Sequence, residues 1–136
     1  MARLREEDLM QIQVFDWIKK MGLDDFIFHP ANERKCSLRT GALFKSKGVK
    51  AGVSDIVILK ASKGFHGALI ELKTEKGRLS VNQKSFLDTM KLNGYFTAVC
   101  RSAREAKNII SHYLNLNTIP LRTQHLEPEQ DFQGEF

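Results

Sequence analysis

Cysteine, proline and long apolar runs are all scarce in this sequence. The two cysteines, Cys36 and Cys100, lie far apart and lack the close Cys or His spacing of a zinc site or a disulfide framework. No uninterrupted stretch approaches the roughly 20 apolar residues that a membrane helix requires, and the first ten residues are rich in charge. We therefore expect a reduced, soluble, cytoplasmic protein with no membrane partner.

The composition suits one domain and leaves no room for a second. Of the 136 residues, 42% are hydrophobic and nine are Phe, which is enough for a single core. The formal net charge of +5 suits a polyanionic partner, but it is also common in proteins that never bind nucleic acid. Charge alone therefore does not decide between these classes.

Apolar residues at helical spacing predict three helices. Between residues 3 and 21 they recur at steps of three and four, and Gly22 ends the pattern. Two later helices open on a serine that has the spacing of a capping box with a residue three positions on: Ser80 with Gln83, and Ser102 with Glu105.

Short apolar runs predict strands at 26–29, 56–59, 68–73 and 95–100. The segment 60–67 contains two glycines and predicts a hairpin connection between the second and third of these strands. Residues 30–52 break the pattern and predict a basic loop region with one helical turn around 42–45. The alternation of helices and strands predicts an α/β fold.

The end of the chain differs from the rest. Residues 115–136 contain two of the three prolines, show no clear period and become acidic. We expect a domain over 1–114, followed by a C-terminal extension that is flexible or docks on a partner subunit.

Two acids and a lysine occupy the ends of neighbouring predicted strands. Asp55 directly precedes the strand 56–59, while Glu71 and Lys73 lie two residues apart in one strand and therefore point to the same face. If these strands pair as a hairpin, Asp55 lies beside Glu71, and two such carboxylates repel each other unless a proton or a cation separates them. The pattern predicts a site for a hard divalent ion, Mg²⁺ or Mn²⁺, because such ions accept oxygen ligands.

Each of these residues also has a structural explanation. A Glu-x-Lys pair on a strand is usually a solvent-facing ion pair worth about 0 to 1 kcal/mol, and an Asp before a strand is usually a turn residue. The apolar neighbours of Glu71 and Lys73 favour a metal site over these structural explanations, because charges are disfavoured there unless they are paired or bind a metal. Glu7, which shares a helix face with Gln11, is a candidate third acid, although an acid there also complements the positive helix N-terminus.

Basic residues suit the binding of nucleic-acid phosphates, with affinity that falls with salt and carries little base information. An ordinary solvated charged loop is the alternative interpretation. The candidates are Arg34, Lys35, Lys45, Lys47, Lys50, Lys76 and Arg78. The four histidines are scattered, and we expect them to be surface or packing residues.

The runs GVSDIVIL and ALIELKTEKGRLSVNQKSFLDTMKLNGYFTAVCRSAREAKNII resemble the VRR-NUC (virus-type replication-repair nuclease) branch of the PD-(D/E)XK superfamily, as found in small phage and bacterial proteins. The similarity covers about residues 7–114. Its most specific elements are Gly52 and Asp55 in GVSD, the ELK motif with its KTEKGRLSVNQ continuation, and the EDLMQ spacing of Glu7. It implies a PD-(D/E)XK restriction-endonuclease-like core, with a small mixed sheet flanked by helices.

The resemblance also implies roles for individual residues. Asp55 and Glu71 would bind the metal, with the backbone carbonyl of Leu72 nearby. Glu7 would be a further acidic ligand, directly or through water. Lys73 would position or activate the attacking water.

Two other positions bear on the same comparison. Gln83 matches a glutamine that the family keeps on its following helix, where it supports the site. A helix-capping role with Ser80 is the competing interpretation. Ser54 stands where the family usually has Pro, which affects the turn but removes no ligand.

The function expected from the resemblance is a metal-dependent, structure-selective DNA endonuclease that cuts branched DNA such as Holliday junctions. A homodimer is expected because such junctions present two equivalent strands. One alternative is a nuclease that acts on flap, nicked or linear duplex DNA. Another is a non-catalytic DNA-binding module in which the acids and Lys73 form structural ion pairs.

Overall fold

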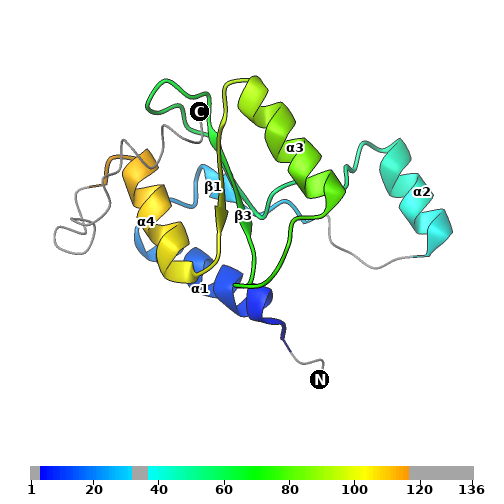
Figure 1. Cartoon of the computed structure of the whole chain (residues 1–136), viewed down its shortest axis with the longest axis horizontal. Coiled ribbons are helices and arrows are strands. Elements are labelled where there is room, and N and C mark those ends of the chain that lie inside the picture. Colours follow the sequence, from blue (N-terminus) through cyan, green and yellow to red (C-terminus); the bar gives the residue numbers. More distant parts are fainter. Residues whose placement is uncertain (1–3, 32–36, 117–136) are drawn as a thin grey trace.

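The chain folds around a four-stranded mixed sheet with the strand order β1-β2-β3-β4 (Figure 1). The structure is a computed structural model that describes residues 4–31 and 37–116. β1 pairs with β2 and β2 with β3 in antiparallel fashion, while β3 and β4 are parallel. The elements are, in order, α1 (Glu6–Lys20), β1 (Ile27–Phe28), α2 (Leu38–Ser46), β2 (Ile56–Ile58), β3 (Ala68–Leu72), α3 (Val81–Leu92), β4 (Phe96–Cys100) and α4 (Ala103–Tyr113).

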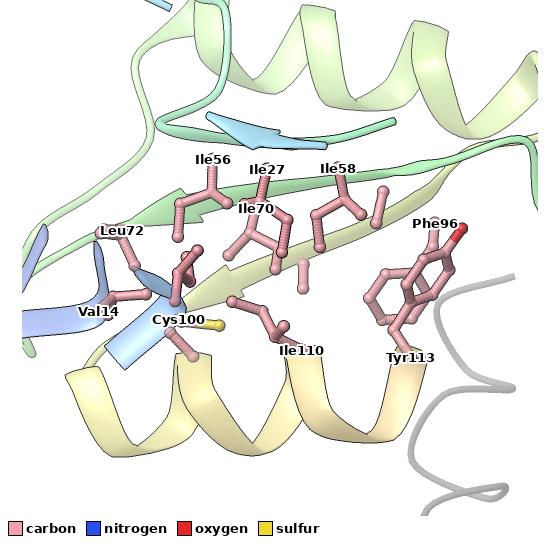
Figure 2. Close-up of a cluster of buried hydrophobic side chains, with 14 of the residues drawn as sticks. Val14, Ile27, Ile56, Ile58, Ile70, Leu72, Phe96, Cys100, Ile110 and Tyr113 are labelled. Carbon is pink, nitrogen blue, oxygen red and sulfur yellow. The ribbon is translucent and has the colours of Figure 1, made fainter. Parts of the chain in front are cut away.

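The core lies between one face of the sheet and helices α1 and α4 (Figure 2). Ile56, Ile70 and Leu72 point into it from β2 and β3, and Val14 of α1 and Ile110 of α4 meet them, all at most 1% exposed. Helix α3 covers the opposite face of the sheet (Figure 2). Because side chains alternate along a strand, the neighbours of these core residues face α3. The predicted α/β class with a small mixed sheet flanked by helices is confirmed.

The helix starts follow the predicted capping residues, with one difference. Ser80 and Gln83 form the full reciprocal capping box of α3. Ser102 caps α4 by accepting a hydrogen bond from the backbone N–H of Glu105, as expected. The carboxylate of Glu105, however, accepts from the backbone N–H of Arg101, 3.2 Å away, and not from Ser102. The backbone N–H that bonds to Glu105 is thus that of the residue before the predicted one.

Helix α2 is longer than the single turn predicted around 42–45. Ser37 caps it by accepting from the backbone N–H of Thr40, and the helix continues for nine residues. None of its residues is buried, and it stands apart from the sheet, beyond α3 (Figure 1). The helix was underestimated because it lacks the buried apolar stripe from which the other helices were predicted.

The end of α4 is fixed to the hairpin that joins β2 and β3. The Tyr113 hydroxyl donates to the carbonyl oxygen of Lys60, 2.7 Å away, and the Ser62 hydroxyl donates to the carbonyl oxygen of Tyr113. Burial raises the pKa of Tyr113 to about 12. Of the predicted extension 115–136, all but residues 115–116 lie outside the described residues. Within the described residues, no helix has the length and apolar character to cross a membrane.

Candidate active site

The pairing of β2 with β3 places Asp55 beside Glu71. Ile56 lies opposite Ile70 in the antiparallel register. Asp55, which directly precedes β2, therefore faces Glu71, the next residue of β3. Both acids are buried, with 8% of Asp55 and 2% of Glu71 exposed. The backbone N–H of Leu72 donates to Oδ2 of Asp55 at 2.8 Å, which fixes this carboxylate against the end of β3. The two acids therefore have the relative position expected from the sequence.

The surroundings of Glu71 disfavour its negative charge. Its pKa is raised to about 9, first by burial and then by the neighbouring Asp55 carboxylate. Lys73 acts in the opposite direction. Oε2 of Glu71 is buried and has no hydrogen-bond partner among the described residues. A buried carboxylate oxygen without a donor, next to a second carboxylate, has the chemistry of a cation site.

Helix α1 brings a third acid to the same end of the sheet. Oε1 of Glu7 lies 4.0 Å from Nζ of Lys73. Val14 and Ile18, on the same side of the helix, are fully buried and hold α1 against the sheet. Glu7 is therefore directed toward the ammonium of Lys73 by the packing of its helix. Glu7 thus has a contact with Lys73 in addition to its position in the first turn of α1.

Gln83 makes both of the contacts that the sequence left as alternatives. Its Oε1 accepts from the backbone N–H of Ser80 at 2.9 Å, which completes the helix cap. Its Nε2 donates to Oε1 of Glu71 at 2.8 Å. The amide orientation is determined by the cap, because a backbone N–H requires an acceptor. Gln83 consequently presents a donor to Glu71.

The oxygen atoms at the end of β3 suit a divalent cation. Within residues 4–31 and 37–116 no group of three or more His, Cys, Asp or Glu side chains could hold a metal ion. The two neighbouring carboxylates of Asp55 and Glu71 are both buried. The Leu72 carbonyl is a third oxygen. Since the N–H and C=O of one strand residue point to the same side, it faces the side of β3 on which Asp55 lies.

Comparison with known proteins identifies the family. The VRR-NUC domain family matches residues 2–104. The chain belongs to the VRR-NUC family. A solved structure described as a VRR_NUC domain protein is 28% identical, with a TM-score of 0.73, and the match covers 85% of this chain and 93% of that one. No curated protein matches the chain. The resemblance in the sequence motifs and the PD-(D/E)XK-like fold are thus confirmed, and the family is one of nucleases.

The loop before β2 of this VRR-NUC domain packs tightly on α3. Gly52 has a positive φ of 85°, and a Cβ built on it would lie 2.5 Å from the backbone carbon of Asn82. Only glycine permits this approach, which places the loop beside the first turn of α3. Ser54 follows, fully buried, and its hydroxyl has no hydrogen-bond partner within the described part of the chain. Asp55 follows Ser54 directly and accepts the hydrogen bond from the backbone N–H of Leu72.

His29 has a contact that the sequence analysis missed. Its Nδ1 lies 2.7 Å from the carbonyl oxygen of Asp55. A carbonyl can only accept, so Nδ1 carries the proton and the ring supports the backbone at Asp55. A lone histidine 26 residues earlier in the chain carries no sequence signal for such a contact.

The predicted DNA-binding residues are distributed over several segments. Lys45 and Lys47 lie at the C-terminal end of α2, and Lys50 lies on the loop that leads to Asp55. Lys76 and Arg78 lie on the connection between β3 and α3 and are exposed. Arg34 and Lys35 lie outside the described residues. Arg101, which is not among the predicted residues, contacts the connection that bears Lys76 through its guanidinium.

Proposed function

We propose that this VRR-NUC protein is an endonuclease that hydrolyses DNA phosphodiester bonds with the help of Mg²⁺ or Mn²⁺. The observation that carries the proposal is the burial of the Glu71 carboxylate beside Asp55, with Lys73 on the same face. One oxygen of Glu71 has no hydrogen-bond partner among the residues that the structure describes. Two buried acids in contact destabilise a fold unless they share a proton or a cation. A purely structural ion pair would not require the second acid.

Five residues have proposed roles in the site. Asp55, Glu71 and the Leu72 carbonyl would hold the ion, with Glu7 as a further acidic ligand, directly or through water. When bound, a divalent ion offsets the charge of the phosphate and lowers the pKa of a coordinated water. The ammonium of Lys73, held by the rigid strand next to these acids, adds positive charge where the transition state becomes more negative and positions the attacking water.

Gln83 supports this arrangement by orienting the Glu71 carboxylate. Its Nε2 donates to Oε1, and a hydrogen bond to the ionised carboxylate favours the charged form that a cation needs. We therefore assign Gln83 as a positioning residue. Its cap with Ser80 keeps the amide in place during turnover.

DNA would be held through its phosphates. The exposed basic residues on α2, on the loop before β2 and on the β3–α3 connection carry positive charge without a pattern that would read bases. The proposed contacts are those predicted from the sequence, Arg34, Lys35, Lys45, Lys47, Lys50, Lys76 and Arg78. Binding should accordingly weaken steeply with salt.

We infer further that the substrate is branched DNA, such as a Holliday junction, and that the active form is a homodimer. A two-fold symmetric junction offers two equivalent strands, which a two-fold symmetric dimer can cut with two equivalent sites. Exposed apolar side chains on α1 and β1, Ile12 and Phe28 among them, offer surface for such a contact. Sedimentation at micromolar concentration tests this inference, and a monomer that cuts junctions would refute it.

The proposed activity is tested by cleavage of a synthetic junction, a flap and a linear duplex at matched salt. We expect cleavage with Mg²⁺ or Mn²⁺, none in EDTA, and preference for the junction. Asp55→Asn should abolish cutting and retain much of the DNA binding, whereas Asp16→Asn, at an exposed position of α1, should cut normally. DNA binding without any cleavage by the wild type would favour a non-catalytic binding module.

A further inference from the structure

Arg101 is held by the backbone of the turn that follows β3. Its Nη1 donates to the carbonyl oxygens of Thr74, Glu75 and Gly77, at 2.8, 3.4 and 2.6 Å. These residues come directly after Lys73 and directly before Arg78. The guanidinium thus has a defined position although the residue is exposed. One contact of this kind would be ordinary, but three convergent carbonyls fix both the arginine and the turn.

The turn and Arg101 lie at the same end of the sheet as the carboxylates. Leu72 is paired with Cys100 in the parallel register, and the backbone N–H of Lys73 donates to the carbonyl of Cys100 at 2.9 Å. The Cys100 side chain is fully buried in the core (Figure 2), so the alternation along the strand directs the next residue toward the face on which Glu71 and Lys73 lie. Arg101 therefore borders the proposed active site.

The charge of Arg101 is not neutralised by this arrangement. Carbonyl oxygens accept hydrogen bonds but carry no formal charge, and no described acid forms an ion pair with the guanidinium. The carboxylate of Glu105 bonds to the backbone N–H of Arg101. A guanidinium has five N–H donors. The described contacts all use Nη1, which leaves the donors of Nε and Nη2 for a ligand outside the turn.

We propose that Arg101 is a phosphate-binding residue that contacts the DNA backbone beside the scissile bond. This proposal rests on the proposed nuclease function. The guanidinium fork matches the oxygens of a phosphodiester, and a fork already held by three carbonyls loses little conformational freedom on binding. The same contacts order the turn that carries Lys76 and Arg78. Arg101 is thus both a DNA contact and a positioning residue for its basic neighbours.

The salt dependence of DNA binding tests the direct contact. Binding of a fluorescent junction would be followed by anisotropy in EDTA between about 50 and 200 mM salt, where each lost phosphate contact lowers the slope of log K against log salt by roughly 0.9. We expect this loss for Arg101→Met. It is also expected for Arg101→Gln, which keeps a polar side chain at this exposed position, so this variant remains informative if the methionine variant fails to fold.

A matched control variant distinguishes a local effect at Arg101 from an effect of the net charge of the protein. Lys20→Met removes one exposed charge at the far end of α1, about 20 Å along the helix from Glu7. It is expected to leave the slope of the wild type unchanged. An equal loss of slope in Lys20→Met and Arg101→Gln would overturn the proposal, because the effect would then reflect net charge alone.

A second set of variants distinguishes a direct phosphate contact of Arg101 from an indirect effect through the turn. In a protein that already carries Lys76→Met and Arg78→Met, Arg101→Gln should still lower the slope by about 0.9. No further change in that background would mean that Arg101 only orders its neighbours, and it would overturn the phosphate contact. Failure of the wild type to bind DNA at any salt concentration would instead refute the proposed function itself.

Discussion

Replacement of Glu71 by glutamine is expected to remove a pH dependence from the stability of the metal-free protein. The carboxyl is 2% exposed, and burial together with the Asp55 carboxylate raises its pKa from 4.5 to about 9. Between these two values the folded protein binds a proton at this pair of acids that the unfolded chain releases. Its contribution to stability is complete below the unfolded pKa and is lost as the pH rises through the folded pKa.

The magnitude follows from one bound proton. The free energy of unfolding should fall by at most about 1.4 kcal/mol per pH unit within this window. Between pH 6 and pH 8 the wild type should therefore lose roughly 2 to 3 kcal/mol relative to Glu71→Gln. Glutamine has the shape of the protonated acid, and its amide oxygen can still accept the hydrogen bond of Gln83. The variant is thus expected to be the more stable protein at pH 8, although it loses cleavage activity.

The measurement is urea unfolding in EDTA at pH 6, 7 and 8, for both proteins. Other titrating groups are common to the two chains, so they cancel in the difference between the two free energies. With saturating Mg²⁺ the wild type should gain stability at pH 8, because the ion replaces the proton between the two carboxylates, while the variant should gain much less. Parallel pH profiles in EDTA would show that the Glu71–Asp55 pair holds no extra proton, and would refute the electrostatic basis of the proposed site.

Two further substitutions test neighbouring parts of the site. Lys73→Met is expected to lower the single-turnover cleavage rate by on the order of 10²-fold with little change in DNA affinity, and a rate equal to that of the wild type would remove Lys73 from the chemistry. Gly52→Ala is expected to lower the free energy of unfolding by about 2 to 4 kcal/mol, since it combines an unfavourable positive φ with a clash against the α3 backbone. Gly48→Ala is the control, because Gly48 has a φ of 98° but open space around it. Its free energy of unfolding is expected to fall by about 1 to 2 kcal/mol. Equal losses in the two variants would show that the packing on α3 contributes nothing to stability.

The paired strands and the acids at their ends could be predicted because they depend on local pattern. Short apolar runs mark the two buried strands, and a hairpin between them then brings the flanking residues together. Asp55 and Glu71 were placed side by side on this basis. Their catalytic roles, together with the carbonyl ligand at Leu72, came from the resemblance to the family and remain predictions.

Contacts to the backbone could not be predicted in the same way. Arg101 binds carbonyls 24 to 27 residues earlier, and His29 binds the carbonyl of Asp55 26 residues later. A carbonyl is present at every residue, so no residue type in the sequence marks it as a partner. Such contacts follow from the three-dimensional course of the chain. Helix α2 was underestimated for a related reason, since it has no buried face to produce an apolar period.

Gln83 illustrates how local and tertiary determinants meet at one residue. The competing interpretations, helix cap and support for the site, assumed that a side chain does one of these. A primary amide has an acceptor and a donor on opposite sides, and the Ser80 N–H occupies the acceptor. The donor must then face away from the helix start, toward Glu71. The beginning of α3 and the orientation of the central carboxylate are therefore established together, so that any change that frays the first turn of α3 also disorders the candidate metal site.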